Sequence, residues 1–531
     1  MPKLDIPYAQ TGYFSKLICD YLDQKPELAP FYGRFPSTDN LMAQLVEKRG
    51  SFPQASRAAI VSALKKQYMA MDVGETTAEN IESLSGANTF TITTGHQLNL
   101  FTGPSYFLYK IFSVINLCKT LQAAHPEYRF VPVYWMATED HDFEEIDHFS
   151  SRGIKYQWQR EASGPVGRLD TKGLDKVLEQ LKTNWGNSQA ARELYDLFEQ
   201  SYLKHDNLAE ATRYMANRLF KEQGLVIVDG DDAQLKTLFA PAVKRELMEG
   251  VSYTRVTQTT EALKKLGYPG QVHPREINLF YIQDGLRARI VREGAVFRVL
   301  DTDISFDEVS LMAEIENHPE RFSPNALLRP LYQEIILPNL CYVGGGGELA
   351  YWFQLKACFQ AFDVPFPAIL LRNSLQLASV RQIEKIERLD VAVQDLFKKP
   401  ELLREWYTKR LSSLPVDFSK QKAFLQKQFE DLFELAKQTD ASFVGAVAAQ
   451  QKKQLNGLDH LEKRLLRAEK RQNADKLNRL QALHEALFPK GHLQERMTNF
   501  SELYLEYGTE LLQHIAAHTD PLNGALRVVY I

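Results

Sequence analysis

The sequence has few cysteines, no long apolar run and little net charge. Its 531 residues include only four cysteines, and none of them forms a close pair: Cys19, Cys118, Cys341 and Cys358. This argues against a disulfide framework and a cysteine zinc knuckle, and it suits a reducing compartment. No uncharged apolar stretch approaches the roughly 18 residues of a membrane span, and the start MPKLDIPYAQ lacks a signal-peptide pattern. The net charge of −4 gives no overall attraction to nucleic acid or membrane. We expect a cytoplasmic protein.

A strand–helix–strand pattern begins near residue 90. FTITTG (90–95) is a β-branched run that ends in glycine, and FVPVYWMA (130–137) is a second apolar strand. Between them, apolar residues recur at helical spacing from Pro104, which suits a first helical turn, to about residue 123. This βαβ unit predicts that the two strands are parallel.

Further strands extend the predicted sheet. GLVIVDG (224–230) and FPAILL (366–371) are candidate parallel strands. INLFYIQ, LRARIV and AVFRVL (277–300) alternate instead, with glycine turns between them, and predict an antiparallel meander in an insertion. The first 85 residues are helical and polar in pattern. We therefore expect an α/β protein whose parallel sheet is interrupted by inserted modules.

Residues 375–488 predict a pair of long antiparallel helices. They contain few glycines and one clear break, at Leu414-Pro415. Apolar residues follow three-four spacing in two sets whose phase slips around Gln472 and Asn473: Leu455, Leu458, Leu461, Leu465 and Ala468, then Leu477, Leu480, Leu483 and Leu487. The basic stretch 461–480 indicates partner packing more than nucleic-acid binding.

Three segments at predicted strand ends carry candidate chemistry, and the first is TGHQLNLFTGPSYFLYK (94–110). Gly95 and Gly103 allow the backbone close to a ligand, while Thr102 suits a cap for the helix near Pro104. Free N–H groups at a helix start favour phosphate or carboxylate. Three side chains add donors: His96, Gln97 and Lys110. The alternative is a tight turn whose threonine only caps a helix.

The second segment is VPVYWMATEDHDFEEIDH (131–148). Glu139, Asp140, His141 and Asp142 follow the end of a strand, where open α/β sheets place their ligands. Like charges this close need a cation, a metal or a donor-rich substrate to offset them. A metal held by His141 and His148 is the weaker interpretation, because no further Cys or His completes a zinc set. His141 is alternatively a general base toward an amine, and a solvated acidic loop is the remaining alternative.

The third segment is RPLYQEIILPNLCYVGGGGELAYWFQLK (329–356). The glycines Gly344–Gly347 join a short strand to a helix that opens with Glu348, and they match neither GxGxxG nor a Walker motif. They indicate that the backbone approaches something closely. Arg329 and Arg372 are natural partners for carboxylate or phosphate. Three aromatic residues predict packing first and pocket lining second: Tyr342, Tyr351 and Trp352.

In this order, GHQLNLFTGPSYFLYK, VPVYWMATEDHDFEEIDH and RPLYQEIILPNLCYVGGGGELAYWFQLK closely resemble the cysteine-adding enzyme family of bacillithiol biosynthesis. LEKRLLRAEKRQNADKL and LFPKGHLQERMTNFSELYLEYG, within 461–508, strengthen the resemblance. It implies a Rossmann-like core similar to class I aminoacyl-tRNA synthetases, with connecting-peptide insertions and an antiparallel coiled-coil arm that forms a homodimer. It also implies the last pathway step, in which L-cysteine is added to the glucosamine amine of glucosaminyl-malate. By analogy with the synthetases, ATP with Mg²⁺ would form a cysteinyl-adenylate, and no zinc is expected.

The resemblance implies a division of the chain. Its expected parts are N-terminal helices with the first half of the core (1–150), a helical connecting-peptide insertion (151–220), core (221–284), a second insertion (285–340), core (341–374), the coiled-coil arm (375–490) and a segment returning to the core (491–531).

The predicted site combines all three segments. His141 is the candidate base and Asp140 assists it, so that the two handle amino groups. The other predicted nucleotide- or substrate-binding residues are Thr94, Gly95, His96, Gln97, Thr102, Gly103, Lys110, Glu139, Asp142, Arg329, Tyr342, Gly344, Gly345, Glu348 and Arg372. No metal ligand, nucleic acid or membrane partner is predicted. Two alternatives stay open: a synthetase-like nucleotidyltransferase acting on another amine, and a dimeric nucleotide-binding scaffold that catalyses nothing alone.

Overall fold

The computed structural model describes residues 3–531, which form two compact units. We call residues 3–376 together with 494–529 the core unit, and residues 377–493 together with 530–531 the arm unit. The chain therefore leaves the core unit, forms the arm unit and returns.

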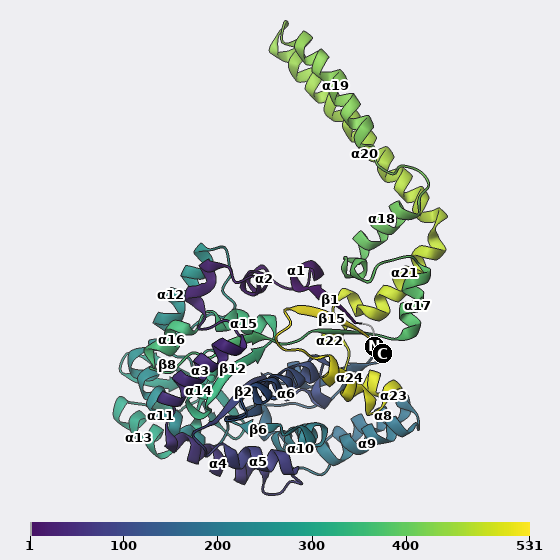
Figure 1. The fold of residues 1–531 in the computed structure, drawn as a ribbon. Coiled ribbons are helices and arrows are strands. Elements are labelled where there is room, and N and C mark those ends of the chain that lie inside the picture. Colours follow the sequence, from purple (N-terminus) through teal and green to yellow (C-terminus); the bar gives the residue numbers. More distant parts are fainter. Residues whose placement is uncertain (1–2) are drawn as a thin grey trace. The chain divides into compact units, whose positions relative to one another are not determined.

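Five parallel strands form the centre of the core unit. They are β2 (Thr89–His96), β3 (Arg129–Met136), β6 (Val226–Asp229), β12 (Asn339–Gly344) and β13 (Ala368–Leu371). Their order is β13-β12-β2-β3-β6, so the direction in which the chain adds strands reverses between β2 and β12. Figure 1 labels three of these strands: β2, β6 and β12. The predicted strands are confirmed, and the order is that of a Rossmann-like sheet.

The helix α6 (Tyr106–Ala124) connects β2 to β3 and completes the predicted βαβ unit. It begins two residues after Pro104, and its N-cap is Ser105. The prediction that Thr102 caps this helix is wrong. Thr102 lies in a short turn with a positive φ of 69°, and its hydroxyl has no hydrogen-bond partner within the described residues.

One face of the parallel sheet is covered by α6 and by α3 (Thr38–Ser51) from the N-terminal region. Leu41 and Leu45 of α3 and Val114 of α6 pack with Phe90 and Ile92 of β2. Such apolar burial is the main stabilising contribution to a core of this kind. The N-terminal helix α3 thus helps to cover one face of the sheet, a role that the sequence pattern did not indicate.

The first insertion is mainly helical. A hairpin of β4 (His148–Ser151) and β5 (Ile154–Gln157) precedes α8 (Leu174–Trp185), α9 (Gln189–Tyr202) and α10 (Leu208–Phe220).

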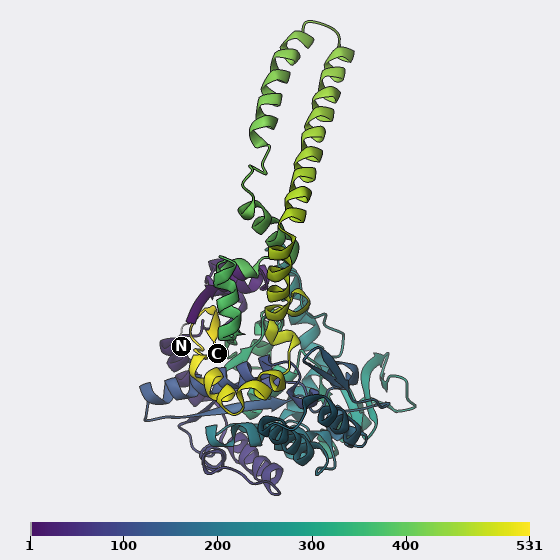
Figure 2. The same cartoon turned by 90° about the vertical axis from the view of Figure 1, so that its right-hand side faces the viewer.

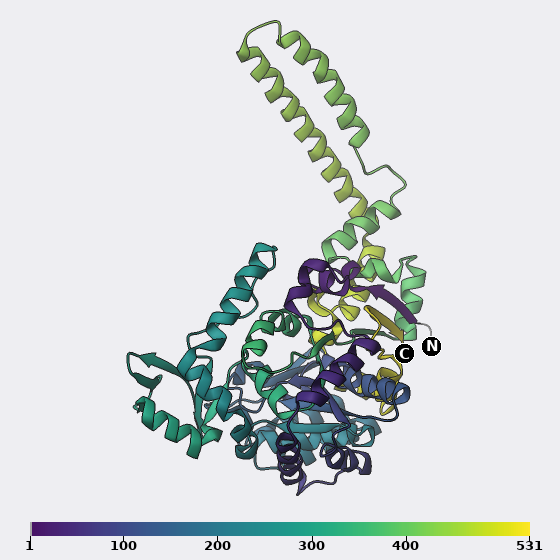
Figure 3. The same ribbon diagram turned by 60° about the vertical axis from the view of Figure 1, so that its left-hand side comes forward.

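The second insertion is an antiparallel sheet of order β10-β9-β8-β7-β11. Figure 3 shows this region in teal. The predicted meander is confirmed, and two short strands extend it. The strands are β7 (Leu279–Gln283), β8 (Leu286–Glu293), β9 (Val296–Val299), β10 (Ser305–Phe306) and β11 (Phe322–Pro324). The exact domain limits given above stay a prediction.

The N-terminus also contains a strand that the sequence pattern did not indicate. β1 (Lys3–Pro7) pairs antiparallel with β15 (Ala525–Tyr530), from Lys3 opposite Val529 to Pro7 opposite Ala525. Five residues carry little periodicity, and their partner lies at the other end of the chain. The interpretation of the first 85 residues as helical is therefore corrected at this strand.

The arm unit is a helical hairpin. α19 (Ser419–Ala436) and α20 (Ala441–Gln472) run side by side and are joined by a short connection (Figure 2). The predicted phase slip coincides with the boundary between α20 and α21 (Ala474–Leu487), and the predicted break lies between α18 (Pro400–Leu411) and α19. Leu477, Leu480, Leu483 and Leu487 are buried, as expected, but Leu461 is 52% exposed, so one hairpin does not bury the whole stripe.

The remaining principal helices of the core unit are α2 (Lys16–Leu22), α4 (Gln54–Tyr68), α5 (Glu75–Ser83), α11 (Ala233–Glu249), α12 (Val251–Lys265), α13 (Glu308–Asn317), α14 (Arg329–Ile336), α15 (Gly346–Trp352), α16 (Lys356–Ala361), α22 (Gln494–Met497), α23 (Phe500–Tyr507) and α24 (Glu510–His518). No helix within residues 3–531 has the length and apolar character to span a membrane.

Candidate functional site

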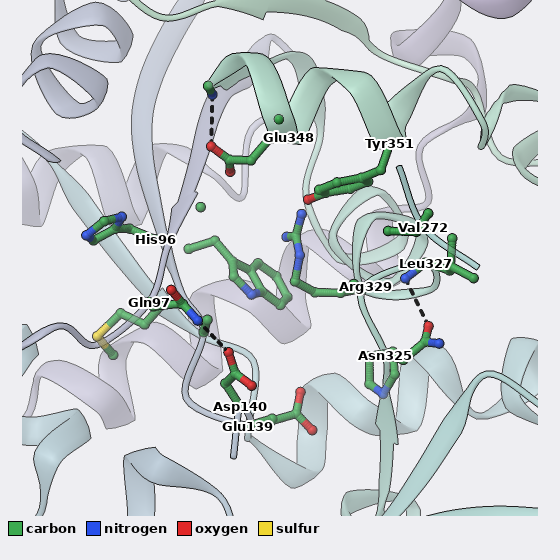
Figure 4. Close-up of a pocket in the computed structure, with 18 of the residues that line it drawn as sticks. His96, Gln97, Glu139, Asp140, Val272, Asn325, Leu327, Arg329, Glu348 and Tyr351 are labelled. Atoms are coloured by element: carbon green, nitrogen blue, oxygen red, sulfur yellow. Dashed lines mark hydrogen bonds between the residues drawn. The ribbon is translucent and has the colours of Figure 1, made fainter. Parts of the chain in front are cut away.

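A cavity of about 740 Å³ lies in the core unit at the carboxyl ends of β2, β3 and β12. Open α/β sheets bind ligands at such a point, where the strand order reverses. The cavity brings together twelve of the predicted residues, and all of them except Arg372 come from the three segments: Gly95, His96, Gln97, Lys110, Glu139, Asp140, His141, Arg329, Tyr342, Gly345, Glu348 and Arg372. Figure 4 labels six of them: His96, Gln97, Glu139, Asp140, Arg329 and Glu348.

Five predicted residues do not line the cavity: Thr94, Thr102, Gly103, Asp142 and Gly344. Thr94 instead joins two strands, because its hydroxyl donates to the carbonyl of Val343 over 2.7 Å. A Cβ at Gly344 would lie 2.7 Å from Leu349 Cδ1 and 3.0 Å from Tyr342 Cε1, so a larger residue there would force these side chains to shift.

Thr102 and Gly103 belong to a turn with unusual backbone angles. Phe101, Thr102 and Gly103 have φ values of 49°, 69° and 63°. The Asn499 side-chain amide holds this turn by donating to the carbonyls of Phe101 and Gly103, over 2.7 and 2.5 Å. The carbonyl of Thr102 in this turn accepts a hydrogen bond from His96 Nε2 over 3.3 Å.

His96 is an uncharged imidazole in this setting. Burial, helped by the nearby Lys110 cation, lowers its pKa from 6.5 to about 3. Because a carbonyl only accepts, Nε2 carries the proton and Nδ1 keeps a lone pair. His96 can therefore accept a hydrogen bond from a ligand at neutral pH without bringing a charge.

Glu348 is the centre of a hydrogen-bonded group beside the glycine turn. Its carboxylate accepts from Lys110 Nζ over 2.5 Å, from the Gly345 N–H over 2.8 Å and from the Tyr342 hydroxyl over 2.8 Å. Burial alone would raise the pKa of Glu348, but Lys110 and these donors outweigh it and lower that pKa. Lys110 also donates to the Gly95 carbonyl over 2.7 Å, so the ion pair connects the ends of β2 and β12.

Two arginines beside this group, the half-buried Arg329 and the buried Arg372, keep buried donors that are unused. Arg329 Nη1 donates to Gln333 over 3.0 Å, whereas Nη2 has no partner within residues 3–531. Arg372 contacts Glu495 through both Nη atoms, but its buried Nε has no partner among the described residues. That Nε lies 3.7 Å from where a Cβ on Gly345 would stand. Unpaired buried donors of this kind suit an anionic ligand.

Lys110, Arg329 and Arg372 form one wall of the cavity, and the wall that carries Asp140 and Glu139 is acidic. Asp140 accepts from the Gln97 amide over 2.9 Å and from the His141 backbone N–H over 2.8 Å. Burial opposes the charge of Asp140, but His141, Gln97 and Arg287 outweigh burial and hold its pKa well below the ordinary value.

Glu139 stands beside Asp140 and is paired with the buried Lys236. Burial, reinforced by Asp231, raises the pKa of Glu139, and Lys236 opposes this. Within residues 3–531, no group of three or more His, Cys, Asp or Glu residues is placed to hold a metal ion.

The candidate base, His141, contacts a residue that the sequence pattern did not indicate. Arg287 Nη1 lies 2.6 Å from His141 Nδ1, and Asp140 Oδ1 lies 3.7 Å from the same nitrogen. Arg287 comes from β8 of the second insertion.

Comparison with known proteins identifies the family. A family model described as "Bacillithiol biosynthesis BshC, N-terminal Rossmann-like domain" matches residues 1–373, and one described as "Bacillithiol biosynthesis BshC, C-terminal coiled-coil domain" matches residues 375–531. The chain belongs to the BshC family. The resemblance stated from the three segments is thereby confirmed.

Relatives named "Putative cysteine ligase BshC" align along the whole chain. The protein of Flavobacterium johnsoniae is 53% identical over 531 residues and covers 100% of both chains. That of Flavobacterium psychrophilum is 51% identical, covering 100% of this chain and 99% of its own. That of Cytophaga hutchinsonii is 38% identical, covering 96% and 95%.

A solved structure titled a putative arginyl-tRNA synthetase from Campylobacter jejuni aligns over 82% of this chain and 97% of its own, with 13% identity. Its TM-score of 0.22 is too low to support an argument about the fold. The similarity to class I synthetases therefore stays a prediction.

Several lining residues of this BshC family member were missed from the sequence. Tyr106 and Trp135 lie within the predicted helix and strand, where nothing in the pattern distinguished them from their apolar neighbours. Arg287 and Asn325 come from the second insertion, and Arg496 from the segment that follows the arm. Isolated arginines and asparagines give no local signal. The one sequence signal that included Arg496 was the stretch LFPKGHLQERMTNF, which was quoted for the resemblance to the family.

Proposed function

We propose that this protein is a cysteine ligase that joins L-cysteine to the amine of glucosaminyl-malate, the last step of bacillithiol biosynthesis. The observation that carries the proposal is the full-length match to relatives named "Putative cysteine ligase BshC". The two walls of the cavity support it, because the substrates combine carboxylates with amino groups.

The cationic wall suits the anionic parts of the substrates. Lys110, Arg329, Arg372 and Arg496 outnumber Glu348 and Glu495 on this side, which leaves excess positive charge. Guanidinium groups bind carboxylate and phosphate oxygens well because their donors match that geometry. We assign to Arg329 and Arg372 the contact with a carboxylate or phosphate.

The acidic wall suits the amino groups. Asp140, held ionised, and Glu139 would attract an ammonium group toward the carboxyl end of β3. His141 stands beside them and is the candidate that receives the proton which this amine must lose before it attacks.

ATP is the co-substrate of the proposal. The unpartnered N–H groups of Arg329 and Arg372 fit a phosphate, and Mg²⁺ would arrive on the ATP phosphates, since it is usually bound through phosphates and one or two carboxylates. The cysteine carboxylate attacks the α-phosphorus and releases pyrophosphate, giving a cysteinyl-adenylate. The neutral glucosamine amine then attacks the carbonyl carbon, the amide bond forms as the bond to AMP breaks, and the nitrogen loses a second proton to solvent.

We also propose that two copies associate through the arm unit. Phe424, Leu435 and Leu461 are 66%, 61% and 52% exposed on α19 and α20, and a second hairpin would cover them. The free cysteines fit a reducing cytoplasm as the place of work.

The test is a mass-spectrometric assay of purified protein with cysteine, glucosaminyl-malate and ATP-Mg²⁺. The expected result is bacillithiol, with one pyrophosphate released per product. Product without ATP would discard the adenylate while keeping the ligase. ATP binding without turnover, together with unchanged bacillithiol in a deletion strain, would overturn the proposal and favour a scaffold.

The variant His141→Ala should abolish product while the fold stays intact, and full activity would remove His141 from the reaction.

A further inference from the structure

The contact between Arg287 and His141 fixes the protonation of the imidazole. Arg287 Nη1 lies 2.6 Å from His141 Nδ1. A guanidinium has only N–H donors and keeps its proton, so it cannot accept a hydrogen bond. Nδ1 must therefore accept with its lone pair, and the proton of the neutral ring must be on Nε2.

This arrangement limits how His141 can act as a base. Nε2 already carries a proton, so only Nδ1 can take up another. Nδ1 is occupied by Arg287, and a proton there would face a cation 2.6 Å away. Arg287 therefore occupies the one nitrogen of His141 that could take up a proton.

Arg287 is held in this position by the antiparallel sheet. Its Nε donates to the Ser323 hydroxyl over 3.4 Å and its Nη2 to the Pro324 carbonyl over 3.3 Å. The guanidinium also stacks 4.0 Å from the centre of the Phe280 ring. Both hydrogen bonds are long, so each restrains the guanidinium weakly.

A second partner is ready for a protonated His141. The charged groups that face the ring are Arg287 from β8 and Asp140 from the end of β3, whereas Phe280 from β7 adds an uncharged ring 5.5 Å away. Asp140 Oδ1 lies 3.7 Å from Nδ1, and its pKa is held low, so it is an anion at neutral pH. An imidazolium would turn from Arg287 to Asp140.

We propose that Arg287 is a positioning residue that masks the basic nitrogen of His141 until an anionic group of a substrate draws the guanidinium away. This inference rests on the proposed function, and it specifies what makes the basic nitrogen of His141 available. The displacing group is a carboxylate or phosphate oxygen, since Arg287 lines the same cavity. The ammonium of the amine substrate then gives a proton to Nδ1, the amine becomes nucleophilic, and the imidazolium pairs with Asp140. The proton leaves to water when Arg287 returns.

The tautomer of His141 can be tested without measuring enzyme activity. A negative result would therefore count against the masking by Arg287 and not against the ligase assignment. Full-length protein with ¹⁵N-labelled histidine is studied by NMR at pH 7, and the His141 signals are assigned from their loss in His141→Gln. We expect an unprotonated Nδ1 and a protonated Nε2. In Arg287→Met the Nδ1 signal should shift as the other tautomer or the cation becomes populated. Arg289→Met, which changes an exposed arginine of the same strand, is the matched control and should change nothing. A protonated Nδ1 in the unaltered protein, or identical spectra for Arg287→Met, would overturn the masking.

Two probes identify the displacing anion. L-malate supplies carboxylates and AMP supplies a phosphate, and each is titrated into the labelled protein. The anion that draws Arg287 away should move the Nδ1 signal toward its position in Arg287→Met. A response to malate assigns a carboxylate and a response to AMP assigns a phosphate. No response to either would overturn the unmasking step.

Kinetics separate this role from a merely structural one. Losing a charge-assisted contact to the substrate should raise the KM of the anion-bearing substrate on the order of ten-fold in Arg287→Met, while kcat falls little because the base is already free. Arg287→Lys keeps the positive charge and a donor nitrogen but loses the planar fork, so it should restore the His141 tautomer more fully than it restores the KM. Equal losses of kcat for Arg287→Met and Arg287→Lys, with KM unchanged, would contradict the proposal.

Discussion

Arg372 and Glu495 form a two-point ion pair inside the core unit. The two Nη atoms donate to the two carboxylate oxygens over 3.0 and 2.7 Å, and the side chains are 3% and 1% exposed. The two residues are 123 positions apart, and residues 377–493 of the arm unit lie between them in the sequence. The pair therefore fixes the point at which the returning chain presents its next residue, Arg496, to the cavity.

Removing the anion of this pair should destabilise the core unit strongly. Glu495→Ala leaves the Arg372 guanidinium buried without a counter-charge, which typically costs about 3–5 kcal/mol. The free energy of unfolding, measured by denaturant titration, should fall by that amount. Glu506→Ala, which removes an exposed carboxylate of α23, is the control and should change stability by less than about 0.5 kcal/mol. A loss of similar size in both variants would show that the ion pair contributes little.

The pair between Lys110 and Glu348 should make stability depend on acidity. The pKa of Glu348 is lower in the folded chain than its ordinary value of 4.5. Its contribution to stability is therefore complete above pH 4.5 and is lost as the pH falls through the lowered pKa, because the unfolded chain takes up the proton first.

The measurement compares the unaltered protein with Glu348→Gln by denaturant unfolding between pH 7 and the acid range. Glu348→Gln should be less stable at pH 7, and the difference should shrink below pH 4.5. Glu506→Gln serves as the control, with no difference at either pH. A difference that is constant with pH would mean that the carboxylate charge is not what stabilises the turn.

The elements that carry the site could be predicted because their signals are local. β2 and β3 are apolar runs that end in glycine or in acidic residues, and the turn at Gly345 is marked by its glycine run. Since parallel strands present their carboxyl ends at one edge of a sheet, the residues after them were expected to meet there. The cavity at this edge collects residues from all three segments.

The remaining lining residues depend on contacts between distant parts of the chain. Arg287 reaches the cavity because a meander of the second insertion packs over the sheet edge, and Arg496 because Glu495 binds Arg372. Neither residue type is unusual on a strand or in a loop. The strained turn at Thr102 was misread as a helix cap for the same reason, since Asn499 and Tyr202 hold it from far away in the sequence.

Asn499 should be essential for that turn. Asn499→Ala removes the amide that donates to the carbonyls of Phe101 and Gly103, and it leaves both acceptors buried. We expect a loss of about 1–3 kcal/mol in the free energy of unfolding. Faster proteolysis near residue 102 should accompany it, because Phe101 and Thr102 hold positive φ values only while they are restrained. The matched control is Asn523→Ala, which loses an exposed hydrogen bond to Asp5. Unchanged stability of Asn499→Ala would show that the turn holds itself.

The exposed apolar residues of the arm unit should set the oligomeric state. Phe424→Asp together with Leu435→Asp places charges on α19 where 66% and 61% of the two side chains are exposed, so the variant should lose association without losing its fold. Burying those charges in an interface would cost several kcal/mol, enough to shift association by orders of magnitude. Light scattering coupled to size-exclusion chromatography should give a dimer mass for the unaltered protein and a monomer mass for the variant, with the same helical content by circular dichroism. Lys452→Glu, which changes an exposed charge on α20, is the control and should stay dimeric. A monomeric unaltered protein would contradict the dimer directly, and a dimeric double variant would place the interface away from this face of the hairpin.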